Sequence, residues 1–111
     1  MGVWIMLYIH TLLERKVEKK EEKEEGISKV LGALRECAGS VVNVKENVQL
    51  LYMQNAVVEI KNGTTIFVKL VGDAKTVITW MDVLVKAGFK VDWYEILVEG
   101  TDIGTTFSPD V

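Results

Sequence analysis

The sequence predicts an α+β domain in which two helices cover one face of an antiparallel β-sheet. Three observations favour this class. Apolar residues follow a helical period in two stretches, the other stretches alternate in the manner of strands, and an Asn62-Gly63 pair joins two of the strand-like segments. With 111 residues, 49% of them hydrophobic, the chain suffices for one domain with its own core and leaves no room for two.

The first element is the apolar run Gly2 to Ile9, which we expect to be a strand. The run is shorter than the roughly 20 residues that a membrane-spanning helix needs. A signal peptide would have basic residues before the apolar run and small residues after it, and neither is present here. We therefore expect no membrane association and a cytoplasmic location. Met6 is an alternative start, in which case residues 1–5 would be an N-terminal extension.

A charged segment and a helix follow. Residues 14–25 are almost entirely Glu, Lys and Arg with mixed signs, which favours a charged loop or the exposed start of a helix. The helix is predicted over 26–38, because apolar residues fall on one stripe and Gly39 stands after it. The stripe consists of Ile27, Val30, Leu31, Leu34, Cys37 and Ala38. We expect Cys37 to be a small core residue.

The period then changes to that of strands. The valine-rich residues 41–52 supply extra β-structure. The runs 56–61 and 64–71 flank Asn62-Gly63, which predicts a hairpin with a two-residue turn.

A second helix follows this hairpin, with Asp73 as N-cap and Gly88 as its end. Its predicted apolar stripe contains Val77, Ile78, Met81, Leu84 and Val85. The last strand is predicted over 90–99, and residues 100–111 are expected to form a flexible tail.

The resulting order of strand, helix, strand, strand, helix, strand resembles the split β-α-β-β-α-β arrangement of ferredoxin-like domains. The expected fold is thus a two-layer sandwich formed by residues 1–99, with extra β-structure at 41–52. The resemblance concerns architecture alone and implies no function, because this fold hosts many unrelated activities.

Alternation along the strands also predicts a large apolar surface on the helix-free face of the sheet. The candidate interface residues there are Trp4, Met6, Tyr8, Phe67, Trp93 and Leu97. A monomer rarely exposes so much contiguous apolar surface. Our first hypothesis is therefore a small binding or regulatory module that forms a homodimer through this face and has no chemistry of its own.

Two other function classes stay open. A nucleic-acid-associated factor is the second hypothesis, because Tyr8 and Phe67 resemble the stacking aromatics of RNA-recognition motifs. The net charge of −3 and the absence from residues 64–71 of that family's basic residue, glycine and paired aromatics make nucleic acid an unfavourable partner. The third hypothesis is an enzyme whose site forms across a dimer, and a groove for a protein or small-molecule ligand is a further alternative.

Catalytic, metal and cofactor sites are not predicted. His10 and Glu14 lie four residues apart, but His10 is expected near a strand end, where such spacing does not converge with Cys37 on a metal. Similarly, Glu95 and Glu99 share one face of the last strand while Asp92 points away. The Lys75-Thr76 pair lacks the glycines of a phosphate loop. A bias toward Lys and Glu, 22 residues together, resembles the composition of thermophile proteins.

Overall fold

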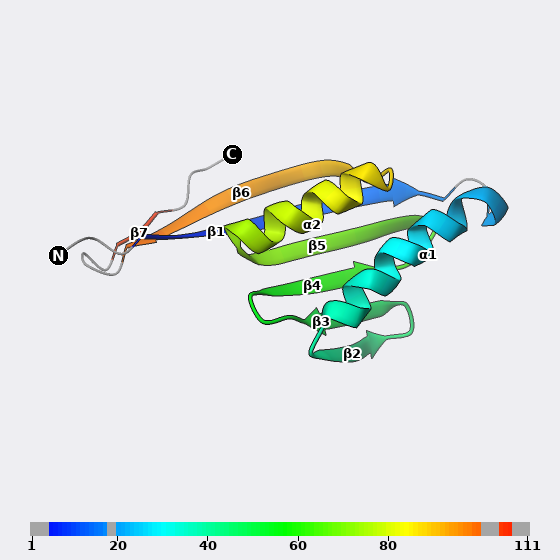
Figure 1. Cartoon of the computed structure of the whole chain (residues 1–111), viewed down its shortest axis with the longest axis horizontal. Coiled ribbons are helices and arrows are strands. Elements are labelled where there is room, and N and C mark those ends of the chain that lie inside the picture. The colour runs from blue at the N-terminus through cyan, green and yellow to red at the C-terminus, as the bar shows by residue number, and fades with distance from the viewer. Residues whose placement is uncertain (1–4, 18–19, 101–104, 108–111) are drawn as a thin grey trace.

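The helical and strand-like periods of the sequence correspond to two helices and seven strands in the computed structural model, which describes residues 5–17, 20–100 and 105–107 (Figure 1). The strands are β1 (Ile5–Lys16), β2 (Ser40–Lys45), β3 (Val48–Tyr52), β4 (Ala56–Lys61), β5 (Thr65–Asp73), β6 (Lys90–Gly100) and β7 (Thr105–Phe107). The helices are α1 (Lys20–Cys37) and α2 (Ala74–Lys86).

The strands form one antiparallel sheet in the order β2-β3-β4-β5-β1-β6-β7. Strand β1 pairs with β5 on one side and with β6 on the other. Both helices lie over the same face of the sheet (Figure 1). The predicted α+β class, with two helices on one antiparallel sheet, is therefore confirmed. The extra β-structure expected at 41–52 forms the β2–β3 hairpin, which extends the sheet beyond β4.

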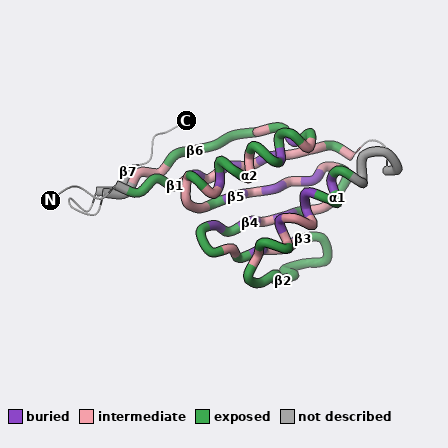
Figure 2. The backbone as a smooth tube through the Cα atoms, in the orientation of Figure 1, coloured by how far each residue is buried: buried purple, intermediate pink, exposed green. Residues whose placement is uncertain are grey.

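The hydrophobic core lies between the helices and the sheet, where purple buried segments alternate along β4 and β5 in Figure 2. Burial alternates along these strands because successive side chains point to opposite faces. The helices contribute Leu34 and Leu84, which are fully buried against the sheet. The remaining fully buried side chains are Leu13, Leu51, Val58, Ile60, Val68, Leu70, Val77 and Thr11.

The predicted β4–β5 hairpin is confirmed, with a different turn. Residues Asn62, Gly63 and Thr64 separate the two strands, and Gly63 does not adopt the positive φ that a two-residue Asn-Gly turn requires. The loop is held from outside instead. The Asn62 amide donates to the Asn47 carbonyl oxygen, and the Asn47 side chain donates to the Asn62 carbonyl oxygen, both at 2.9 Å.

The charged segment 14–25 is divided between two elements. Glu14, Arg15 and Lys16 belong to β1, and α1 begins at Lys20, six residues before the predicted helix start. Because β1 pairs on both sides, its two hydrogen-bond ladders hold charged residues in strand conformation despite their weak strand propensity. Consequently His10 lies in the middle of β1. The prediction that it lies near a strand end is wrong.

Three residues of the predicted helical stripes are exposed. Ile78 and Val85 are 55% and 47% exposed, since they lie about 80–100° around α2 from the buried Val77. Cys37 is also exposed, so the prediction that it packs in the core is wrong. It lies in the last turn of α1, beyond the fully buried Leu34, where the helix reaches the edge of the sheet (Figure 1).

The ends of the last elements also differ from expectation. Asp73 stands at the N-cap of α2 without a side-chain capping hydrogen bond, whereas Gly88, at φ +98°, ends that helix as predicted. Strand β6 continues to Gly100, and β7 pairs with it inside the segment expected to be a tail. The rest of that segment, 101–104 and 108–111, lies outside the described residues.

Candidate interaction surface

The side of the sheet that faces away from the helices is here called the open face. Residues paired directly across antiparallel strands point to the same side of a sheet, so the register determines which residues lie on this face. One row of paired residues crosses six strands and is here called the central row. From β2 through β3, β4, β5 and β1 to β6, it consists of Val42, Leu50, Glu59, Lys69, Leu12 and Trp93.

Two further rows flank the central row from β3 to β6. Toward the β4–β5 turn, the row is Val48, Lys61, Phe67, Glu14 and Lys90. On the other side, the row is Tyr52, Val57, Val71, His10 and Glu95. The next row beyond it is shorter and consists of Asp73, Tyr8 and Leu97.

Large apolar side chains dominate the middle of the open face. Tyr52 is 42% exposed, Trp93 39%, and Val57 and Val71 37% each, and Met6, 40% exposed, lies on the same face further along β1. Scattered apolar residues are ordinary on a protein surface, but Tyr52, Val57 and Val71 are paired directly across three neighbouring strands.

Five of the six candidate interface residues lie on this face. Met6 and Tyr8 come from β1, Phe67 from β5, and Trp93 and Leu97 from β6. Trp4 lies outside the described residues. Six other apolar residues of this face were not predicted, namely Leu12, Val42, Val48, Leu50, Tyr52 and Val71. Leu12 has the same parity as Tyr8 along β1, so extending the predicted strand past His10 would have found it.

Charged groups on the open face are arranged as neighbouring opposite charges. Lys69 Nζ lies 3.7 Å from Glu59 Oε1 in the central row. His10 Nδ1 lies 3.3 Å from Glu95 Oε2. Lys61, Phe67, Leu12 and the Lys69–Glu59 pair line a hollow of about 300 Å³. The lining contains two apolar side chains, Leu12 and Phe67, and one more positive than negative side chain.

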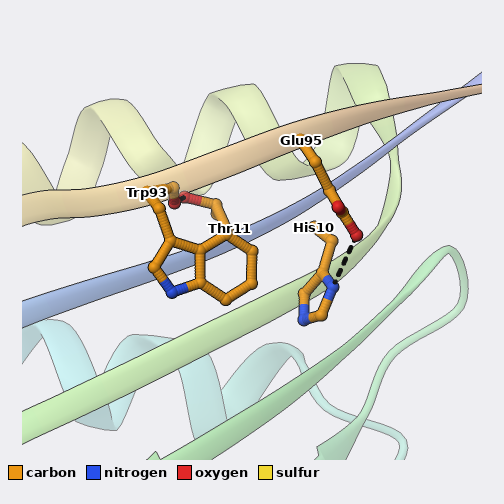
Figure 3. A network of polar contacts seen from close by, with 4 residues as sticks. All are labelled: His10, Thr11, Trp93 and Glu95. Carbon is orange, nitrogen blue, oxygen red and sulfur yellow. Dashed lines mark hydrogen bonds and ion pairs between the residues drawn. The ribbon is translucent and has the colours of Figure 1, made fainter. Parts of the chain in front are cut away.

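His10 is held by neighbours on β6 (Figure 3). Its Nδ1 donates toward the Glu95 carboxylate, and its ring stands edge-on to Trp93 at a centroid distance of 4.7 Å. Next to it, the buried Thr11 hydroxyl donates to the Trp93 carbonyl oxygen at 2.8 Å, where the β1–β6 register shifts. His10 Nε2 is buried without a hydrogen-bond partner among the described residues. These contacts fix the ring as a packing element between two strands.

The other chemical candidates do not converge. His10 and Glu14 lie on the same face but two rows apart, roughly 13 Å along the strand, and Cys37 is exposed on α1. No group of three His, Cys, Asp or Glu side chains in the described parts of the chain lies close enough to hold a metal ion.

The aromatic residues that motivated the nucleic-acid hypothesis are well separated. Tyr8 pairs with Asp73, and Phe67 pairs with Glu14 six residues further along β1. That offset corresponds to roughly 20 Å. Tyr8 and Phe67 therefore do not form one stacking platform for adjacent bases.

A second set of exposed apolar side chains lies on the helix side of the sheet. It comprises Leu7, Ile78, Val85, Tyr94 and Ile96, which are 38–55% exposed. The two helices do not cover β1 and β6 completely, and this set lies on those two strands and on the flank of α2 beside them. These side chains are at least as exposed as the apolar residues of the open face, so any test of the open face must distinguish the two sets.

Comparison of the chain with protein-family models, curated proteins and solved structures gives no significant match. Among the helices of the described residues, neither has the length and apolar character needed to cross a membrane. Function must therefore be inferred from the surface itself.

Proposed function

We propose that this protein is a small self-associating binding module whose open face packs against the open face of a second copy. The observation that carries the proposal is the apolar surface across β3, β4, β5, β1 and β6. Covering this surface removes apolar area from water, which is the main driving force of association.

The size of the open face supports this proposal. The strands β3, β4, β5, β1 and β6 contain 5, 6, 9, 12 and 11 residues. At about 4.8 Å between strands and about 3.4 Å per residue, they span roughly 700 Å² in projection. Side chains roughen this plane, so its accessible area exceeds its projection. A stable interface buries about 800 Å² per partner, which is the same scale.

The charge pattern favours a second copy as the partner. A two-fold axis along the central row exchanges the two flanking rows between copies. Glu14 then faces His10 of the second copy, and Lys90 faces Glu95 of the second copy. The same operation places Phe67 against Val71 and Val48 against Tyr52. Opposite charges therefore meet at β1 and β6, and apolar groups meet at β3 and β5, whereas Lys61 faces Val57 of the second copy. Lys69 and Glu59 lie on the axis, where each ion-paired set approaches the same set of the second copy.

We also propose that β4, β5, β1 and β6 with the two helices are a ferredoxin-like unit to which the β2–β3 hairpin is added. The order β4-β5-β1-β6 supports this interpretation, because it is the order expected for a split β-α-β-β-α-β domain. A cytoplasmic location is part of the proposal, supported by a single cysteine that allows no disulfide within the chain.

The test is the molar mass in solution, measured by light scattering over a range of concentrations. The double variant Phe67→Glu/Trp93→Glu places carboxylates in the proposed interface and should raise the dissociation constant at least tenfold. Circular dichroism checks that the variant is folded. Ile78→Glu is the matched control, because it makes the same change at an exposed apolar residue on the helix side.

The charges provide an independent test. Lys90→Glu should weaken association by opposing Glu95 of the second copy, and adding Glu95→Lys should restore it. Dissociation by Ile78→Glu alone would assign the interface to the apolar set on the helix side and contradict the proposal.

A further inference from the structure

Strand β2 is an edge of the sheet, and all six of its residues are exposed. Val41, Val42 and Val44 are 40%, 45% and 50% exposed. No strand of the described residues pairs with β2 on the side away from β3. Alternate N–H and C=O groups of β2 therefore point outward from the sheet and are available to another strand.

This edge lacks most of the devices that usually prevent pairing. Natural edge strands often carry proline, inward-pointing charges or bulges. Strand β2 has no proline, its one charge is the terminal Lys45, and its register shift lies between Asn43 and Lys45. The segment Ser40–Asn43 is thus a regular and uncharged template with two valines at its centre.

We propose that β2 pairs antiparallel with β2 of a second copy around a two-fold axis through Val42. This register places Val42 opposite Val42 and Val41 opposite Asn43 of the other copy. No like charges oppose each other in it, since residues 40–44 carry none. The two sheets become one continuous sheet, with the helices of both copies on one side and both open faces on the other.

The edge pairing rests on the proposed function and extends it. Val42 is itself a member of the central row. The two-fold axis along the central row therefore meets the axis through Val42, and the two are perpendicular. Two intersecting perpendicular two-fold axes generate a closed tetramer of D2 symmetry. The expected assembly has four copies, with open faces paired inside and helices outside.

The experiment is light scattering on the full chain, whose mass is 12.5 kDa. The unmodified protein should have four times this mass. Phe67→Glu/Trp93→Glu should leave dimers paired through the β2 edge. Val41→Lys should leave dimers paired through the open face, because two ammonium groups then lie diagonally across the new strand pair. Val41 points to the helix side, so this change does not touch the open face.

Charge complementation tests the edge directly. Val41→Glu alone should also give dimers, whereas an equimolar mixture of Val41→Lys and Val41→Glu should recover the tetramer. A cysteine scan tests the register. In Cys37→Ser/Phe67→Glu/Trp93→Glu protein, Val42→Cys should form an intermolecular disulfide under mild oxidation, while Lys45→Cys should not, because only residue 42 lies opposite itself.

The outcomes separate the two proposals. A dimer that Phe67→Glu/Trp93→Glu converts to a monomer, and that Val41→Lys leaves intact, would overturn the edge pairing and support the open face. A dimer that Val41→Lys converts to a monomer, and that Phe67→Glu/Trp93→Glu leaves intact, would overturn the proposed function and the tetramer together. A monomer at high concentration would overturn both.

Discussion

Gly72 provides the sharpest test of the fold, because the same substitution at another glycine should have the opposite effect. Gly72 lies in β5 opposite Ala56 and Ile9, on the helix side of the sheet. A Cβ atom on Gly72 would lie 2.3 Å from the Asn55 carbonyl oxygen and 2.5 Å from Ala56 Cα. Both are backbone atoms, so relief requires the start of β4 to move.

The cost of Gly72→Ala follows from this contact. Overpacking that displaces backbone costs roughly 1–3 kcal/mol, and the two short contacts place Gly72→Ala at the upper end. For a domain of this size, about 2–3 kcal/mol lowers the melting temperature by roughly 10–20 °C. The hydrogen bond from the Asp73 amide to the Asn55 carbonyl oxygen, 2.9 Å long, should weaken as β4 moves.

Gly32→Ala is the matched control. Gly32 lies within α1, and a Cβ atom there would meet nothing within 4 Å. Alanine favours a helix over glycine by about 1 kcal/mol, so Gly32→Ala should raise the melting temperature. Thermal and urea unfolding by circular dichroism, at one protein concentration, measures both changes. Equal changes of the same sign would refute the packing of β4 against β5.

Three further predictions concern the core, the β1–β6 pair and nucleic acid. Leu34→Ala should lower the free energy of unfolding by about 2–5 kcal/mol, whereas Ile78→Ala, at an exposed site, should change it by less than about 0.5 kcal/mol in urea titrations. Thr11→Val should lower the free energy of unfolding by about 1–3 kcal/mol, because the Trp93 carbonyl oxygen loses a buried donor. Thr11→Ser keeps a hydroxyl donor and should lower the free energy of unfolding by less. Labelled single-stranded RNA should show no binding in a fluorescence titration at about 150 mM salt, since counterion release needs several facing cations; submicromolar binding weakened by Phe67→Ala would revive the nucleic-acid hypothesis.

Local signals in the sequence predicted much of the fold. The β4–β5 hairpin follows from Asn62-Gly63 between two alternating runs, and the end of α2 follows from Gly88, whose positive φ suits glycine. Period-two alternation also assigned Phe67 and Trp93 to the face without helices, because parity along a strand depends only on the neighbouring residues.

What the sequence analysis missed depends on non-local pairing. Strand β1 continues through Glu14 to Lys16 because β5 and β6 flank it, and no residue in that segment signals this. The exposure of Ile78 depends on how far the helical layer reaches across the sheet. Tyr52 joins the open face through the β3–β4 register. The width of the candidate surface could therefore not be predicted from alternation alone.

The open-face interface is tested by the molar masses of the unmodified protein and of Phe67→Glu/Trp93→Glu, determined side by side by light scattering. If the open face is an interface between copies, the unmodified protein has at least twice the 12.5 kDa mass of the chain, and the folded variant has half the mass of the unmodified assembly. An unmodified protein of 12.5 kDa at high concentration, or an assembly whose mass the two substitutions leave unchanged, would show that the open face is not an interface between copies.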